Sequence, residues 1–463
     1  MRCRACFVGA ALFVCVLSLG LLFTRPTPES YDAQIMFQVT QSMVDHGNFA
    51  VHQDTLGMNT PYSIFGIGMS LLMAVPYWVA ERLQQSPGAL VMSVNAAVVS
   101  TIAVAVFALG LATRATAVQS LAAAVLTVFG TLLLPYVATG FSEPSVSLAI
   151  ALGLIGVQTN RPVVAGGASG LALLMRPDSA LLVVPVLAVA AWLAGGRSWQ
   201  AALRFCVALM PAVVWTGAYN TLRFGAPWRT GYFFLTFNHP LEAGLYGLLL
   251  SPAAGLFIYV PLLPLALVGL FLAMRRLPLL VATAAVLLAV RVPFYAVWCA
   301  WSAYWVWGPR YLVPAMPVLA VGLIEVCRRW SGFHLGVKAA VALVFAVSGL
   351  VQVVGAAIGY EHAAMFSALL RAHPPVPGPG FITDLILPNT EAIWDRILFD
   401  WSLWPIPDEA RDLLQGRHLS SHWLAPTPNI TAIAALLVCG ALTLAVAVVA
   451  ARRSDKLAQA TPG

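Results

Sequence analysis

The first polar segment of the chain, residues 24–61, concentrates side chains that could do acid–base chemistry. It contains four carboxylates, those of Glu29, Asp32, Asp45 and Asp54. The chain as a whole is 60% hydrophobic and only 9% charged. In so apolar a protein a carboxylate is costly unless it is solvated, paired with a cation or used in chemistry. This segment is therefore the first place to expect an active site.

Asp32 is the strongest candidate within the segment. It would occupy the first turn of an amphipathic helix starting near Tyr31, because the apolar residues that follow recur at helical spacing. These residues are Ile35, Met36, Val39 and Met43. A carboxylate beside the positive end of a helix stays ionised and can accept a proton from a hydroxyl, as a general base does. The alternative is that Asp32 only caps the helix.

Four arginines lie where apolar segments end on the predicted outer side of the membrane. They are Arg176, Arg223, Arg229 and Arg310. An arginine in such a place opposes the positive-inside trend, and its planar fork suits a phosphate group. Arg310 is the strongest of the four, because Gly308 and Tyr311 beside it indicate a shaped turn. The alternatives are snorkelling to the membrane surface or, for Arg176, pairing with Asp178.

Two further features could line a substrate cavity. Glu143 precedes a proline at the start of an apolar helix, where an acid either caps the helix or faces a cavity. Segment 294–311 contains four Trp and three Tyr in eighteen residues. This composition is typical of an interfacial aromatic belt and could also form a stacking floor for a sugar ring or prenyl chain. We expect Tyr31, Trp307 and Tyr311 to line the cavity with Glu143.

The elements that position these side chains are membrane-spanning helices. Repeated apolar segments of about 20 residues predict an all-α polytopic membrane protein with about twelve transmembrane helices. The predicted spans are residues 5–23, 89–112, 116–137, 142–158, 162–175, 178–195, 200–220, 253–274, 278–297, 311–327, 336–358 and 429–451. Segment 62–80 is apolar enough to cross the membrane, but counting it as a span would place every later loop on the opposite side of the membrane. We therefore expect it to form a helix lying along the outer interface.

Acidic and basic residues separate along this topology. The short connections on one side are rich in arginine, as cytoplasmic loops are. All of the 18 acidic residues except Glu325 and Asp455 fall on the other side, which also carries the long segments. The formal net charge of +7 therefore reflects orientation and not nucleic-acid binding. We expect both termini in the cytoplasm and the polar chemistry outside.

The same pattern divides the chain into three parts. Residues 1–358 form a transmembrane core, which includes the first outer loop, 24–88. Residues 359–428 are Pro-rich, polar and too long for a simple loop, so we expect a small cap on the outer face. Residues 429–463 supply the last transmembrane helix and a cytoplasmic tail.

The sequence shows no motif for a cofactor, a metal or an activated nucleophile. It has no Walker loop, no dinucleotide-binding glycine motif and no zinc-protease or nucleophile-elbow motif. The histidines are not at metal-ligand spacing. The seven cysteines are scattered, which argues against a disulfide framework or a zinc site. We expect that no cofactor is required, and a divalent metal stays an alternative that no motif indicates.

Several short motifs, taken in order, resemble those of GT-C glycosyltransferases that use lipid-linked sugars. This superfamily includes protein mannosyltransferases and the aminoarabinose transferases acting on lipid A. The motifs are SYDAQIMFQVTQSMVDHGNF, YSIFGIGMSLLMAVP, FSEP, LLMRPDS, NTLRFGAPWRTGY, LLLSPAAGLFIYVPLLPLALVG and WGPRYLVPAMPVL. Their order and spacing resemble most closely the bacterial phospholipid-carrier-dependent branch.

This resemblance implies roles for individual residues. Asp32 would be the catalytic base, with Glu29 as the fallback, while Asp45 would remain an ordinary solvated residue. Arg310 and Arg176 would hold the phosphate of the lipid donor.

The chain departs from the family pattern at two places. Tyr31-Asp32 stands where the family often has an Asp-Glu pair, and Ile64 stands where many members have Lys or Arg. Because no lysine falls on the outer side, a phosphate contact would either be missing or have moved to Arg82 or Arg229.

The implied function is that of a glycosyltransferase in the bacterial plasma (inner) membrane. It would move a sugar from a polyprenyl-phosphate donor to an acceptor hydroxyl at the outer face, with inversion at the anomeric carbon. The acceptor could be a glycan, a lipid or a protein. The alternative is a protein that binds or transports a lipid-linked glycan without chemistry.

Overall fold

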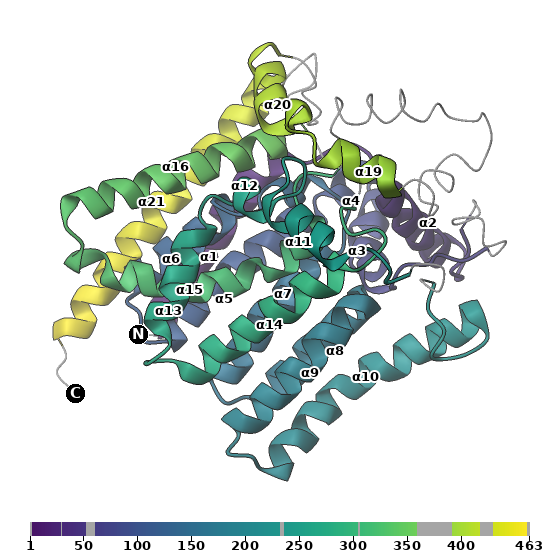
Figure 1. Cartoon of the computed structure of the whole chain (residues 1–463), viewed down its shortest axis with the longest axis horizontal. Coiled ribbons are helices and arrows are strands. Elements are labelled where there is room, and N and C mark those ends of the chain that lie inside the picture. The colour runs from purple at the N-terminus through teal and green to yellow at the C-terminus, as the bar shows by residue number, and fades with distance from the viewer. Residues whose placement is uncertain are drawn as a thin grey trace.

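The computed structural model describes residues 2–28, 30–51, 61–231, 236–303, 306–358, 391–416 and 429–460. Within these ranges the chain is helical, and its one β-bridge is the isolated pair Ala50–Tyr62. The all-α fold class predicted from the sequence is confirmed (Figure 1). Glu29 and Asp54 lie outside the described residues.

The helices that correspond to predicted spans follow the predicted order. They are α1 (Arg2–Leu21), α5 (Val94–Ala112), α6 (Ala117–Phe129), α7 (Glu143–Gln158), α8 (Pro162–Met175), α9 (Pro177–Ala194), α10 (Trp199–Phe224), α13 (Leu263–Ala273), α14 (Pro278–Ala296), α15 (Met316–Arg329), α16 (Leu335–Ile358) and α21 (Ile430–Ala460). In the described part of the chain, eight helical segments are long and apolar enough to cross a membrane. The other predicted spans, at α6, α7, α8 and α13, are helices of 11 to 16 residues. The chain is a multi-pass membrane protein.

Shorter elements connect these helices at their ends. They are α2 (Tyr31–Asp45), α3 (Gly68–Arg82), α4 (Pro87–Met92), η1 (Pro135–Ala138), α11 (Leu241–Leu250), α12 (Leu256–Tyr259), η2 (Arg310–Ala315), η3 (Trp330–Gly332), α19 (Glu391–Leu398), η5 (Trp401–Leu403) and α20 (Pro405–Leu414). Most of them gather at the end of the bundle where the candidate functional residues lie.

Helix α15 forms the centre of the bundle. Every residue from Met316 to Cys327 is buried, and α6, α13 and α14 pack around it. The contact with α13 is close because Gly269 faces Gly322: a Cβ at Gly269 would lie 2.1 Å from the Gly322 carbonyl oxygen. Small residues permit such approach between membrane helices. Helices α10 and α21 lie at the periphery and present most of their surface outward (Figure 1).

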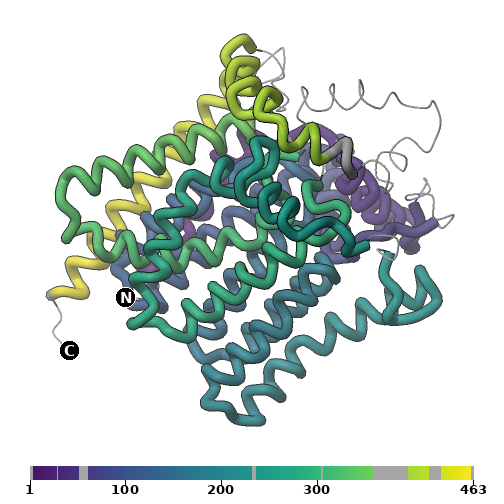
Figure 2. Tube along the Cα trace, viewed as in Figure 1, coloured from purple at the N-terminus to yellow at the C-terminus, as the bar shows by residue number. Residues whose placement is uncertain are grey.

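The two chain ends lie at the same end of the bundle. Helices α1 and α21 run antiparallel, because Ser18 contacts Cys439 while Ala5 and Ala458 line one pocket. Figure 2 shows the start of α1 and the last turn of α21 on the same side of the bundle. The two acidic residues of the arginine-rich connections, Glu325 and Asp455, also lie at this end, which we call the basic end. That the basic end faces the cytoplasm stays a prediction.

Helices α2 and α3 pack together at the opposite end. The Thr40 hydroxyl donates to the Ser70 carbonyl oxygen at 3.1 Å, and the Ser70 hydroxyl donates to the Met36 carbonyl oxygen at 2.8 Å. The Tyr77 hydroxyl donates to the Asp45 carboxylate at 2.7 Å, and burial beside this acid raises the pKa of Tyr77 to about 12. Asp45 is thus paired rather than only solvated. Helix α3 has 15 residues, and its placement along the outer interface stays a prediction.

The described part of the predicted cap, residues 391–416, packs on the bundle. Asp395 of α19 accepts a hydrogen bond from the Trp301 indole at 3.1 Å and lies 3.0 Å from His239 Nε2. Helix α20 contacts α16. The division of the chain into core, cap and tail stays a prediction.

Candidate functional site

Asp32 is held at the start of α2 by a cap and a close helix contact. The Ser30 side chain caps the helix by accepting from the Ala33 amide at 3.2 Å. The capping role proposed as the alternative for Asp32 therefore belongs to Ser30. A Cβ at Gly140 would lie 2.5 Å from the Ala33 methyl, so only glycine allows α2 to pack this closely on the loop before α7. This contact brings Asp32 toward Glu143.

Glu143 is the first residue of α7, and the loop before it is fixed from α5. The buried Asn95 amide donates to the carbonyl oxygens of Thr139 and Phe141 at 2.6 and 2.9 Å. The Glu143 side chain is 1% exposed, and its Oε1 atom accepts from Nε of Arg310 at 2.6 Å and from Arg176. The sequence predicted that Glu143 would either cap the helix or face a cavity. The structure shows neither arrangement, because Glu143 is the buried centre of two ion pairs.

Arg310 lies at the start of η2, two residues after a left-handed glycine. Gly308 has a φ of 65°, which permits the turn that directs Arg310 into the bundle. The guanidinium donates to the carboxylates of Asp32 and Glu143 at once, and it lies 3.6 Å from the centre of the Phe141 ring. The shaped turn predicted around Arg310 is present.

Arg176 connects α8 to α9 and bridges two acids. Because Pro177 follows, Arg176 has extended backbone, with φ of −148° and ψ of 105°. Its Nη2 donates to Asp178 at 3.0 Å, its Nε donates to the same carboxylate at 3.2 Å, and its Nη1 donates to Glu143. The local pairing with Asp178 proposed as an alternative is present together with the longer-range contact.

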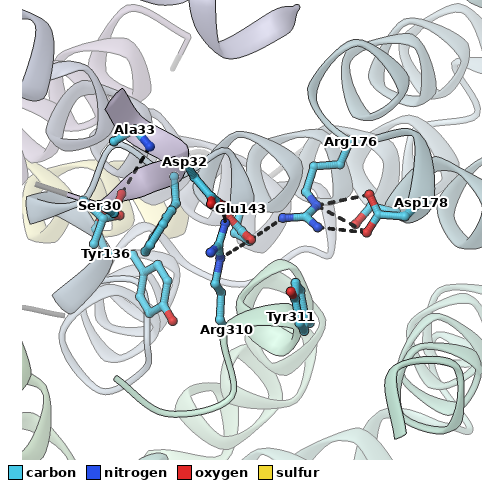
Figure 3. A network of polar contacts seen from close by, with 12 residues as sticks. Ser30, Asp32, Ala33, Tyr136, Glu143, Arg176, Asp178, Arg310 and Tyr311 are labelled. Atoms are coloured by element: carbon cyan, nitrogen blue, oxygen red, sulfur yellow. Dashed lines mark hydrogen bonds and ion pairs between the residues drawn. The ribbon is translucent and has the colours of Figure 1, made fainter. Parts of the chain in front are cut away.

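These residues form one continuous ionic network, which we call the acidic-end site. In Figure 3, acids and arginines alternate in the order Asp32, Arg310, Glu143, Arg176 and Asp178. The Arg176 and Arg310 side chains are 5% and 8% exposed, whereas the Asp32 side chain is 20% exposed. Asp32 is therefore the most accessible carboxylate of the network, and the arginines behind it already bind oxyanions.

A stack of aromatic rings backs the network. Tyr295 and Tyr311 lie parallel at 4.7 Å, and the Tyr295 hydroxyl donates to Asp178 at 2.7 Å. Trp298, Trp301 and Trp307 are all less than 4% exposed. The prediction of an interfacial belt is therefore wrong for these residues, because they pack inside the protein.

Trp307 and Tyr31, both predicted to line the cavity, have other packing partners. Trp307 packs against Tyr259 at 5.1 Å, and its carbonyl oxygen accepts from the Tyr136 hydroxyl at 3.1 Å. Tyr31 packs against a small apolar cluster that includes Ile35. Their roles toward a substrate stay predictions.

The other predicted arginines are not brought into the network. Arg229 lies on an exposed turn and donates to the Phe224 carbonyl oxygen at 3.4 Å. Arg223 is buried and donates to the carbonyl oxygens of Ser63 and Phe65 at 2.5 and 2.8 Å, which fixes the segment before α3. Whether Arg229 contacts a donor phosphate stays a prediction.

Sequence reasoning missed the supporting residues Asn95, Phe141, Ser179 and Tyr295. The available signals were weak: Phe141 opens the motif FSEP, and Tyr295 lies within the aromatic run. Among the described residues, no three His, Cys, Asp or Glu side chains lie together as a metal site would require.

Comparison with solved structures identifies the fold. The chain is similar to the crystal structure of ArnT from Cupriavidus metallidurans bound to undecaprenyl phosphate, with a TM-score of 0.51 and 14% identity over 97% of this chain and 77% of ArnT. A weaker similarity, with a TM-score of 0.47 and 11% identity, is to the archaeal oligosaccharyltransferase AglB from Archaeoglobus fulgidus in complex with an inhibitory peptide and a dolichol-phosphate. It covers 82% of this chain and 59% of AglB, less than two thirds of that protein. No protein-family model and no curated protein matches the chain.

The likeness to ArnT extends over nearly the whole chain. The similarity to ArnT shows a shared fold, and membership of the GT-C superfamily stays a prediction.

Proposed function

We propose that this chain is a membrane glycosyltransferase of the GT-C type that uses a polyprenyl-phosphate sugar as donor. The observation that carries the proposal is the meeting of Asp32 with Arg310 and Arg176 around the buried Glu143. In this arrangement the carboxylate can act as a base toward an acceptor hydroxyl, and the arginines can stabilise the charge on a phosphate leaving group. The undecaprenyl phosphate bound to ArnT, which shares the fold, supports a lipid phosphate as the carrier.

The two arginines are the proposed phosphate ligands. Both present planar forks, and both already donate to carboxylate oxygens. A phosphate group competes for the same donors, because it offers more oxygens and more negative charge than one carboxylate. Asp32 is the partner most readily displaced, because it is the most exposed acid of the network.

Displacement of Asp32 would also prepare it for its role. While Arg310 donates to Asp32, one oxygen of that carboxylate is occupied. When Arg310 turns to the donor phosphate, this oxygen can accept a hydrogen bond from the acceptor hydroxyl. Donor binding and activation of the base are then one event.

The proposed reaction is a single inverting displacement. Asp32 accepts the proton of the acceptor hydroxyl, and the hydroxyl oxygen forms a bond to the anomeric carbon. The bond from that carbon to the phosphate oxygen breaks on the opposite face, and polyprenyl phosphate leaves with the electron pair, stabilised by Arg310 and Arg176. The protein supplies positioning, a base and positive charge, and no cofactor is required.

The proposed location is the outer face of the bacterial plasma membrane. The acidic-end site lies opposite the basic end, whose arginines are typical of cytoplasmic loops. The acceptor would be a glycan, a lipid or a protein that reaches the membrane surface.

Transfer in nanodiscs tests the proposal. Purified protein is given radiolabelled undecaprenyl-phosphate sugars, and label is followed into the glycan, lipid and protein fractions of membranes from a strain that lacks the protein. We expect transfer by the wild type and a loss of about 10²–10⁴-fold in Asp32→Asn, the range for removal of a general base. Near-normal turnover in that variant would remove Asp32 from the mechanism. Binding of undecaprenyl phosphate without transfer of any sugar would favour the non-catalytic binder.

A further inference from the structure

Arg291 is a buried cation within the membrane-spanning helix α14, outside the ionic network of the acidic-end site. Its side chain is among the largest that are fully buried, and the residue is 1% exposed. A charge at such a place is costly in an apolar helix and is retained where it has a role. Within the described part of the chain, its Nη2 atom has no hydrogen-bond partner.

The hydrogen bonds that Arg291 makes go to two different elements. Its Nη1 donates to the Ser179 hydroxyl at 3.3 Å and to the Tyr311 carbonyl oxygen at 3.1 Å. Ser179 belongs to the first turn of α9, which carries Asp178. Tyr311 belongs to η2 and follows Arg310 directly. One guanidinium nitrogen therefore ties together the two elements on which the proposed phosphate ligands depend.

The tie to α9 is reinforced by a second chain of hydrogen bonds. Ser179 Oγ lies 3.1 Å from the Tyr295 hydroxyl, and that hydroxyl donates to Asp178 at 2.7 Å. Because Ser179 accepts from Arg291, its own proton is available for Tyr295. Asp178 in turn orients Arg176 through Nε and Nη2. The orientation of Arg176 is thus linked to Arg291 through neutral hydroxyl groups.

The tie to η2 acts on the backbone. The Tyr311 ring is stacked on Tyr295 at 4.7 Å, and Arg291 lies 5.5 Å from the centre of that same Tyr295 ring. The ring stack and the bond to the Tyr311 carbonyl oxygen together fix the first residues of η2. Arg310 then has only its own side-chain torsions with which to reach Asp32 and Glu143.

We propose that Arg291 is a positioning residue that sets the spacing between Arg176 and Arg310, so that one phosphate group can engage both. The identity of the ligand rests on the proposed function, whereas the positioning role of Arg291 rests on its own contacts. Arg291 does not touch the phosphate. It holds the two elements that do.

The test compares Arg291→Met and Arg291→Lys with the wild type and with Arg276→Met at the basic end. Affinity for undecaprenyl phosphate is measured by native mass spectrometry in nanodiscs, and melting temperature is recorded for each variant. We expect Arg291→Met to weaken binding by about tenfold, the loss expected for one charge-assisted hydrogen bond. Arg291→Lys keeps the charge and one of the two bonds, so it should recover part of the affinity. Arg276→Met should bind like the wild type.

Kinetics separate positioning from a general loss of structure. Partial unfolding lowers kcat in proportion to the folded fraction, whereas a misplaced ligand pair raises the donor KM of the folded enzyme. Arg291→Met with wild-type affinity for undecaprenyl phosphate would overturn the proposal, even if transfer by the wild type is established. If the wild type binds undecaprenyl phosphate but transfers no sugar, the proposed function fails, while the binding comparison still decides the role of Arg291.

A structure of the variant tests the positioning role of Arg291 without any ligand. In Arg291→Met, or in Arg291→Lys if the first variant does not fold, we expect η2 to move relative to α9. Arg176 and Arg310 should then no longer both contact Glu143. Superposition of both guanidinium groups on those of the wild type would overturn the proposal.

Discussion

Two buried glutamates, Glu143 and Glu325, lie at opposite ends of the bundle, and each is surrounded by arginines. At the basic end, Glu325 pairs with Arg276 at 2.8 Å, Arg328 at 3.3 Å and Arg329 at 2.9 Å. Their side chains are 29% to 48% exposed, whereas the two arginines on Glu143 are 5% and 8% exposed. The cations at the basic end are solvated, and those at the acidic end are not.

The remaining donors of these arginines go to different groups. At the basic end they go to backbone: Arg276 donates to the Thr113 carbonyl oxygen at 2.7 Å and Arg328 donates to that of Arg114 at 3.1 Å. At the acidic end they go to further carboxylates, those of Asp32 and Asp178. A carbonyl contact fixes a loop, whereas a contact with an accessible carboxylate can be exchanged for another anion. The first cluster joins connections, and the second is suited to bind and release.

The largest effect should come from neutralising Glu143, with the same substitution at Glu325 as the comparison. In Glu143→Gln, two buried arginines lose a shared anion, so we expect transfer to fall at least 100-fold and stability to fall by about 3 kcal/mol. Glu325→Gln leaves cations that are already hydrated, and the expected loss is about 1 kcal/mol with unchanged transfer. Thermal unfolding in detergent and the transfer assay measure both. Equal effects of the two substitutions would contradict the distinction between the two ends.

Lysine in place of arginine should give a smaller and more selective effect. Arg310→Lys keeps the charge but cannot donate to Asp32 and Glu143 in one planar fork. We expect the affinity for undecaprenyl phosphate to fall by about tenfold, the loss of one charge-assisted hydrogen bond. The matched change, Arg329→Lys, should alter stability by less than about 0.5 kcal/mol, because that side chain is about half exposed. If Arg310→Lys binds undecaprenyl phosphate with wild-type affinity, the planar guanidinium group of Arg310 has no role in phosphate recognition.

The sequence was sufficient to predict the helices but not the ionic network in which their side chains meet. The spans were predictable because the hydrocarbon thickness fixes how long an apolar helix must be. Arg310 and Arg229 are both basic residues at predicted outer helix ends, and only the turn residues beside Arg310 favoured it, yet of these two only Arg310 enters the bundle. The difference arises from tertiary packing: Arg310 meets an acid 167 residues away, and no local pattern encodes such a pairing.

Glu143 illustrates the same limit from the other side. Its position before a proline indicated a helix start, and that was right. Its role as the shared anion of two arginines depended on Asn95 and Gly140, which shape the loop before α7 from separate parts of the chain. The side chains could be proposed one by one, whereas the network required the fold.

The smallest effect concerns Asp455, the other acid of the basic end. Its carboxylate accepts from the amides of Ala117 and Val118 at 2.8 and 3.1 Å, so it neutralises the positive end of α6 and joins α21 to that helix. We expect Asp455→Asn to lower stability by about 0.5–1 kcal/mol, the usual contribution of a charge at a helix terminus, and to leave transfer unchanged.

The control is Asp408→Asn, which breaks an exposed ion pair with Arg411 within α20 and should change the melting temperature by almost nothing. A loss of transfer in Asp455→Asn would contradict the view that acids at the basic end only join helices, because this side chain reaches backbone amides alone among its described hydrogen bonds. A stability loss as large as that of Glu143→Gln would contradict it as well. Unfolding of the two variants side by side therefore tests whether burial of the arginines, rather than the number of ionic contacts, separates the two ends.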